Sequence, residues 1–197
     1  FKIVFAFLKI FLYQKINAWK KFKHNQTFEI YKKFDTQFDE FWEKIKLENK
    51  NTFLLNRSSD WINWHLNNKI QKNNSLIMVK KENNEIKGYA ICINKYDSSL
   101  NLKKAVLIDL MLLKENEKSS LDLILSCIQE SLKSKCDLFQ MVGFNEHKRK
   151  FMNKLKPFEK KNKFSPYLYK SKNLDLDQLL QKKDSWYPSE IEGDSIY

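Results

Sequence analysis

Apolar and polar residues follow one another along the middle of the chain in an order that predicts three consecutive β-strands. Residues 76–79 form a short apolar run, and residues 80–85 form a polar cluster with two asparagines, which is typical of a hairpin turn. Residues 86–94 predict the second strand of that hairpin. Residues 105–113 are apolar on both faces except for Asp109, which is the pattern of a strand at the centre of its sheet.

The second strand has one large and one small face. Its alternation places Tyr89, Ile91 and Ile93 on one side and Gly88, Ala90 and Cys92 on the other. A face of small side chains favours the close approach of another group.

A long helix, a strand and a basic helix follow. Residues 114–120 are polar, and Ser119 or Ser120 is placed to cap the next helix. Apolar residues then recur at helical spacing along one stripe, at Leu121, Ile124, Leu125, Ile128 and Leu132. Residues 138–144 predict a strand, and residues 146–156 predict a helix that Pro157 ends. The whole pattern predicts a layered α/β domain.

The N-terminal part of the chain predicts a domain boundary near residues 24–27. Residues 1–13 are apolar apart from two lysines and are shorter than the ~20 apolar residues that a bilayer span needs. We expect residues 1–26 to form an amphipathic or linker helix at the end of an upstream domain. An interfacial membrane anchor through residues 1–23 is the alternative.

Residues 27–197 then form one domain. It opens with a strand at 28–34 and a helix capped at Thr36. The predicted buried face of that helix carries Phe38, Phe41, Trp42 and Ile45.

The order strand, strand, strand, turn, long helix, strand and helix resembles the core of the GNAT superfamily, whose members transfer an acyl group from coenzyme A to an amine. Upstream, residues 57–65 (Arg-Ser-Ser-Asp-Trp-Ile-Asn-Trp-His) are similar to a helix of GNAT-like domains from surface-polysaccharide gene clusters. Residues 87–89, 108–110 and 186–194 are similar to the same domains. The resemblance runs from about residue 28 to the C-terminus. It implies a mixed, mostly antiparallel central sheet flanked by helices, a small-molecule amine acceptor such as an amino sugar, and a second domain upstream.

The resemblance also implies acetyl-CoA as the donor, held where the third strand ends and the long helix begins. The residues concerned are Leu112, Leu113, Lys118, Ser119 and Ser120. The superfamily carries a Gln/Arg-x-x-Gly-x-Gly/Ala loop there, because glycine lets backbone N–H groups approach the pyrophosphate. Residues 114–120 of this chain contain no glycine. The free N–H groups of the helix, with Lys118 and the two hydroxyls, still favour a phosphate.

A second departure concerns the tyrosine that protonates the leaving thiolate in many members. The corresponding segment, residues 151–158, reads Phe-Met-Asn-Lys-Leu-Lys-Pro-Phe and has no tyrosine. Proton transfer from a placed acid contributes about 10²- to 10⁴-fold to a rate. With these two departures, the resemblance implies either a slow N-acetyltransferase or a GNAT-fold module without chemistry that binds a partner domain or a sugar-linked precursor.

Asp109 and His147 are the candidate proton acceptors. A carboxylate in the middle of an apolar strand is costly to bury unpaired, so Asp109 either takes a proton from the acceptor amine or pairs with a basic or backbone donor and fixes the strand. His147 follows Asn145 and Glu146 in a polar segment, where a surface histidine is the alternative.

Arg57 and Tyr89 are the candidate substrate-binding residues. The chain has two arginines among 36 Lys and Arg residues, and a retained arginine suggests a planar, bidentate contact. That contact is with a substrate carboxylate or phosphate, or with a structural carboxylate.

Composition narrows the function classes. The net charge of +12 comes from lysines in dispersed runs such as 148–150, 160–161 and 182–183, which predict solvated faces and no specific nucleic-acid partner. The basic surface favours anionic ligands, coenzyme A included. Three widely spaced cysteines without a CxxC or HxxxH pattern predict reduced thiols in the cytoplasm and no metal site.

Overall fold

The structure is a computed structural model that describes residues 28–67, 74–157, 159, 170–182 and 185–192. The predicted segment 1–26 and the boundary at 24–27 lie outside the described residues.

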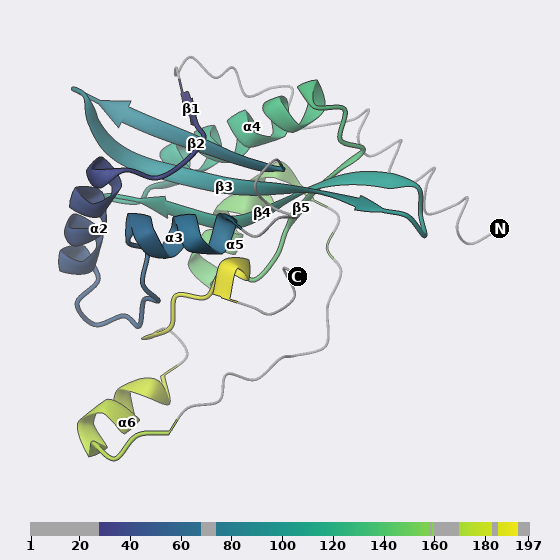
Figure 1. Cartoon of the computed structure of the whole chain (residues 1–197). Helices are drawn as coiled ribbons and strands as arrows, with labels where there is room; N and C mark the ends of the chain where they lie inside the picture. Colours follow the sequence, from purple (N-terminus) through teal and green to yellow (C-terminus); the bar gives the residue numbers. More distant parts are fainter. Residues whose placement is uncertain (1–27, 68–73, 158, 160–169, 183–184, 193–197) are drawn as a thin grey trace.

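A five-stranded sheet forms the centre of the described chain (Figure 1). Its strands, in spatial and sequence order, are β1 (Glu29–Tyr31), β2 (Ser75–Glu82), β3 (Glu85–Asp97), β4 (Leu102–Leu112) and β5 (Leu138–Met141). The first three pairings are antiparallel and the pairing of β4 with β5 is parallel. The parallel pairing requires a crossover, and a long helix supplies it.

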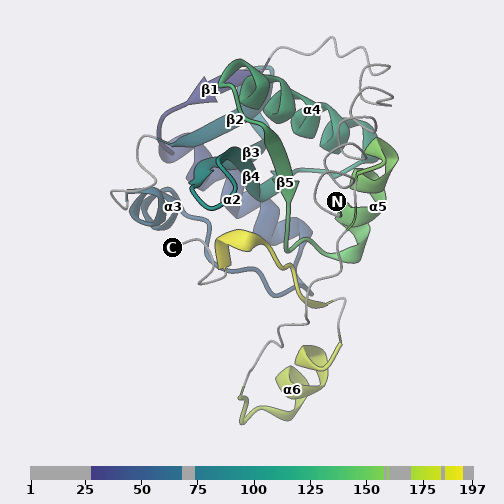
Figure 2. The same ribbon diagram turned by 90° about the vertical axis from the view of Figure 1, so that its right-hand side faces the viewer.

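Helices cover both faces of this sheet (Figures 1 and 2). One face carries α2 (Thr36–Glu48) and α3 (Ser59–Leu66), and the other carries α4 (Glu117–Lys133) and α5 (Glu146–Met152). A 3₁₀ turn, Asn153–Leu155, follows α5. The C-terminal part contains α6 (Leu174–Leu180), which stands away from the sheet in both views, and a second 3₁₀ turn, Glu190–Glu192.

Each face has its own hydrophobic core, and the alternation of β3 divides its residues between them. Tyr89, Ile91 and Ile93 pack with α2 and α3, whereas Ala90 and Cys92 pack with α4. The predicted large and small faces of this strand are confirmed.

A β-bulge interrupts the alternation of β4 at Ile108 and Asp109. Ile91 is opposite Asp109 and Cys92 is opposite Leu107, so Ile108 is the extra residue. A bulge of this kind turns two consecutive side chains to one face. As a result, Asp109 points into the core below α2 and α3, where it meets Tyr89.

The predicted elements are present, but their ends differ. The strand predicted at 28–34 is only Glu29–Tyr31, and the one predicted at 138–144 ends at Met141. The predicted caps are wrong: Asp35 caps α2 instead of Thr36, and Asn116 caps α4 instead of Ser119 or Ser120. Both observed caps accept a backbone N–H through the side chain, as short polar residues do at helix starts.

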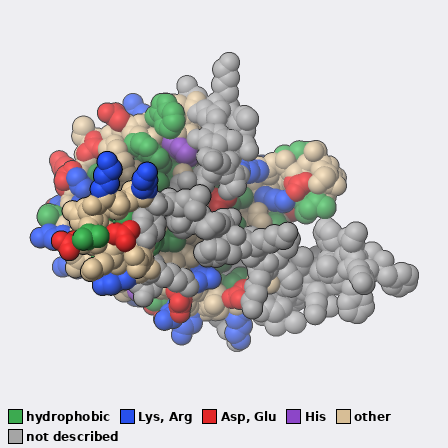
Figure 3. All heavy atoms as spheres, turned by 90° about the horizontal axis from the view of Figure 1, so that it is seen from below, with side chains coloured by type: hydrophobic (Ala, Val, Ile, Leu, Met, Phe, Trp, Pro, Cys, Tyr) green, Lys and Arg blue, Asp and Glu red, His purple; other side chains and the backbone are tan. Residues whose placement is uncertain are grey.

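Basic side chains are spread over the described surface. On the face in Figure 3, Lys and Arg side chains are interspersed with Asp and Glu. Within the described part of the chain, no helix is both long enough and apolar enough to cross a bilayer.

Gly88 lies opposite Leu112 in the pairing of β3 with β4, at a close approach of the two strands. A Cβ added there would lie 2.8 Å from Leu112 Cγ and 2.9 Å from the backbone oxygen of Met111. We expect Gly88→Ala to lower the free energy of unfolding by about 1–3 kcal/mol, because the strand backbone has to shift. Urea denaturation measures this, with Lys87→Ala as the neighbouring control. An unchanged midpoint for Gly88→Ala would show that the contact is not tight.

Candidate active site

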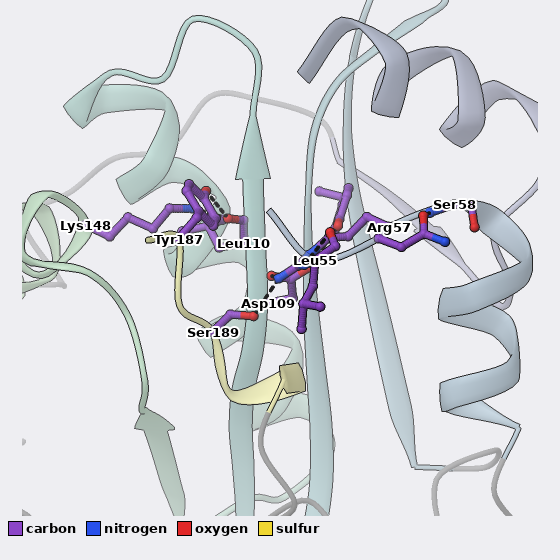
Figure 4. Close-up of polar contacts among 10 residues, drawn as sticks. Leu55, Arg57, Ser58, Asp109, Leu110, Lys148, Tyr187 and Ser189 are labelled. Carbon is purple, nitrogen blue, oxygen red and sulfur yellow. Dashed lines mark hydrogen bonds and ion pairs between the residues drawn. The ribbon is translucent and has the colours of Figure 1, made fainter. Parts of the chain in front are cut away.

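The polar centre of the fold is an ion pair between Arg57 and Asp109. Arg57 Nε donates to Asp109 Oδ2 at 3.1 Å, and Arg57 Nη2 lies 3.5 Å from Asp109 Oδ1. Both side chains are 0% exposed. The same guanidinium donates to the Leu55 carbonyl oxygen at 2.8 Å and to Ser189 Oγ at 2.9 Å (Figure 4).

The start of α3 places the guanidinium. Arg57 directly precedes Ser58, the cap of this helix, whose hydroxyl accepts the N–H of Trp61 at 3.4 Å. Ser59 is tied to α2, since its N–H and hydroxyl both donate to the Asp39 carboxylate at 2.7 Å. Arg57 is thereby held between α2 and the sheet.

Tyr89 completes the cluster. Its hydroxyl donates to Asp109 Oδ2 at 2.8 Å. Burial, and secondly the Asp109 carboxylate, raise the pKa of Tyr89 well above its usual value, so the phenol keeps its proton and remains a donor.

The structure therefore brings three of the predicted site residues together below the surface. Asp109 pairs with a basic donor, as the structural alternative requires, and Arg57 has a structural carboxylate as its partner. The catalytic role of Asp109 and the substrate-binding roles of Arg57 and Tyr89 stay predictions.

The edge of β4 carries a second set of contacts. β5 pairs with β4 only from Lys104 to Leu107, so the last part of β4 extends beyond its neighbour. The C-terminal segment and α5 meet that edge at Leu110. Tyr187 Oη donates to the Leu110 carbonyl oxygen at 3.0 Å, and Lys148 Nζ donates to the same oxygen (Figure 4).

Lys148 was predicted to lie on a solvated face, and that prediction is wrong. Its side chain is 1% exposed, with Nζ 3.4 Å from Glu115 Oε1 and 4.5 Å from the centre of the Tyr187 ring. Burial is the main cause that lowers the pKa of Lys148. Met152 lies four residues further along α5 and is buried, so this spacing would have placed Lys148 on the buried face of the helix.

The N-terminus of α4 holds the predicted cofactor-binding serines. Asn116 Oδ1 accepts the N–H of Ser119 at 3.0 Å, and the hydroxyl of Ser120 donates to Glu115 Oε1 at 3.2 Å. Lys118 is exposed there. Sequence reasoning did not single out Lys80, a largely buried residue of β2 whose Nζ donates to Ser119 Oγ at 3.0 Å.

The other predicted residues lie apart from these clusters. Leu112 is buried against Gly88, and the N–H of Leu113 donates to the Lys87 carbonyl oxygen at 2.9 Å. His147 is exposed on α5, with its ring 4.6 Å from that of Phe151. Among the described residues, no group of three or more His, Cys, Asp or Glu is placed to hold a metal ion.

Solved structures share this architecture. An aminoglycoside acetyltransferase from an uncultured soil metagenomic sample, in complex with sisomicin, superimposes with a TM-score of 0.56 at 15% identity, over 73% of this chain and 96% of that one. A probable acetyltransferase gives 0.51 at 12% identity, over 75% and 99%. The glucosamine-6-phosphate N-acetyltransferase of Arabidopsis thaliana gives 0.51 at 14% identity, over 73% and 100%.

The chain has the GNAT-like, acyl-CoA N-acyltransferase fold of these acetyltransferase structures. The predicted mixed, mostly antiparallel sheet flanked by helices is confirmed. No family model matches the sequence, and no curated protein matches it.

The buried ion pair predicts a large and asymmetric response to mutation. Replacing Asp109 by Asn leaves the Arg57 guanidinium buried without a counter-charge, so we expect the free energy of unfolding to fall by about 3–5 kcal/mol. The double variant Arg57→Met, Asp109→Asn should recover part of that loss. Chemical denaturation of the variants measures both values. A loss below about 1 kcal/mol for Asp109→Asn would mean that the pair is not essential to the fold.

Proposed function

We propose that this chain is an N-acetyltransferase that moves an acetyl group from acetyl-CoA to an amine. The observation that carries the proposal is the fold, which the chain shares with acetyltransferases over 96% or more of their own lengths. Acetyl-CoA supplies the acyl group as a thioester.

The start of α4 fits the phosphates of this donor. The first N–H groups of a helix have no intrahelical partner. The Asn116 side chain accepts that of Ser119, and those of Glu117 and Lys118 precede it in the first turn. Lys80 brings an ammonium group to Ser119, with Glu82 Oε1 as its ion-pair partner at 3.1 Å, and Lys118 adds a second ammonium group in solvent. These two lysines stand in for the close backbone approach that a glycine loop would allow.

An amine attacks a thioester only after losing its proton, so the reaction needs a proton acceptor. We keep Asp109 and His147 as predictions for this role. Asp109 already accepts hydrogen bonds from Arg57 and Tyr89, whereas His147 is open to solvent.

We propose an amino sugar or similar primary amine as the acceptor. Two structures of the same fold are named as an aminoglycoside acetyltransferase and a glucosamine-6-phosphate N-acetyltransferase, which supports this class. The similarity of residues 57–65 to domains from polysaccharide gene clusters supports a place in polysaccharide biosynthesis. The buried free thiols of Cys92, Cys127 and Cys136 support a cytoplasmic location.

A second candidate is a GNAT-fold module that binds a partner without chemistry. Two observations favour it. Tyr187 and Lys148 occupy the β4 edge at Leu110, and the carboxylates of Glu115 and Glu117 lie beside the α4 N-terminus, where they oppose a phosphate.

Calorimetric titration with acetyl-CoA at low salt separates the two candidates. We expect one-to-one binding that weakens about tenfold or more in Lys80→Gln, because a charge-assisted contact with phosphate is lost. Ser119→Asp should abolish binding, because the new carboxylate repels the phosphates. The helix itself is not weakened, since a carboxylate at a helix start stabilises the helix. Lys81→Gln, the adjacent position on β2, is the matched control and should bind like the wild type.

Two outcomes would contradict the proposed donor site. A folded wild-type chain that shows no saturable binding favours the module without chemistry. Binding that is unaffected by both Lys80→Gln and Ser119→Asp places the donor elsewhere.

A further inference from the structure

A small cavity lies between the last turn of α2 and the end of β4. Its volume is about 120 Å³. The buried side chains of Ile45 and Met111 contribute an apolar lining, and Glu48, Asn49, Glu115 and Tyr187 contribute polar groups. Glu48 is exposed, so it marks the side that is open to solvent.

The charge of this cavity is opposite to that of the protein. The chain carries a net charge of +12, yet no Lys or Arg is found among the described residues that line the cavity, whereas two carboxylates are. The two carboxylates differ in whether a cation offsets their charge. Glu115 has Lys148 Nζ at 3.4 Å, but no cationic side chain within the described ranges lies at ion-pair distance from Glu48.

Glu48 stands in an unfavourable place for a carboxylate. It is the last residue of α2, and the C-terminus of a helix carries a partial negative charge of about half an elementary charge. Its Oε2 accepts the N–H of Lys114 at 2.9 Å, and Lys114 has a left-handed backbone with a φ of 48°. That neutral donor fixes the carboxylate at the cavity without neutralising it.

The dimensions suit a small group. The volume of about 120 Å³ is several times the ~10–15 Å³ that one water needs on this measure, so the cavity has room for the aminoalkyl end of a larger molecule. The apolar lining suits the methylene groups, and the carboxylate at the opening suits an ammonium group.

We propose that this cavity binds the ammonium end of a primary amine, with Glu48 as its counter-charge. As the acceptor pocket of an acetyltransferase, the site rests on the proposed function. Binding of the amine does not require the acyl donor, acetyl-CoA. Glu115 connects the cavity to the β4 edge, because it contacts Lys148, which donates to the Leu110 carbonyl oxygen.

The test is a titration with n-propylamine at pH 7, where the amine is charged. Two-dimensional amide NMR monitors the titration, in the absence of acetyl-CoA. We expect saturable shifts at Asn49, Met111 and Leu112, and none with 1-propanol, which has a similar shape but no charge. Glu48→Gln keeps an acceptor for the Lys114 N–H and should weaken amine binding on the order of tenfold.

Two further variants complete the design. Glu43→Gln removes a carboxylate from the exposed side of the same helix and should bind like the wild type. Glu48→Asp keeps the charge and should retain more affinity than Glu48→Gln.

The inference is overturned if Glu48→Gln binds the amine as tightly as the wild type, if propanol gives the same shifts, or if no shift saturates. Because acetyl-CoA is absent from this titration, such a result leaves the donor-binding result standing. Equally, an amine site that survives a failed acetyl-CoA titration would belong to a binding module.

Discussion

The ion pair between Arg57 and Asp109 joins parts of the chain that are far apart in sequence. Arg57 comes from the loop before α3, Asp109 from the bulge of β4, Tyr89 from β3 and Ser189 from the C-terminal segment. Burying two charges is costly, and a pair offsets this only when its remaining hydrogen-bonding groups are also satisfied. Here Leu55, Tyr89 and Ser189 provide those partners, so the cluster specifies how loop, sheet and C-terminus meet.

The C-terminal segment depends on this cluster and completes the sheet edge. Phe53 N–H donates to the Ser185 carbonyl oxygen at 2.6 Å, and Tyr187 N–H donates to the Phe53 carbonyl oxygen at 3.2 Å. Tyr187 then reaches the β4 edge that β5 leaves unpaired. The same segment packs so closely on Gly143 that a Cβ there would lie 3.0 Å from the Glu190 nitrogen. The C-terminal segment therefore covers the edge of the last part of β4, before the chain leads into α4.

Local sequence patterns predicted the strands and helices because their periodicities are short. The period of two on β3 was enough to assign its faces, and the helical spacing of α4 was enough to identify its buried stripe. The helix caps were harder to predict, because several polar residues in a row can cap a helix equally well. At the start of α4, the observed cap Asn116 lies three residues before the predicted Ser119.

The site was predictable only in part. Asp109 and Arg57 were noticeable as exceptions in an apolar strand and in a lysine-rich chain, but nothing local indicates that they meet. The bulge at Ile108 that aims Asp109 inward leaves no signal in the residues themselves. The contact of Arg57 with Ser189 spans 132 residues, and such pairings follow from the tertiary fold alone.

We propose that this fold, with Lys80 and Lys118 in place of a glycine loop, transfers acetyl groups to amines. The most direct measurement is the release of the CoA thiol from acetyl-CoA in the presence of a series of primary amines and amino sugars. We expect a rate that rises with amine concentration, saturates, and disappears when the amine is replaced by the matching alcohol. A folded chain that releases no thiol above the uncatalysed rate with any amine would contradict it.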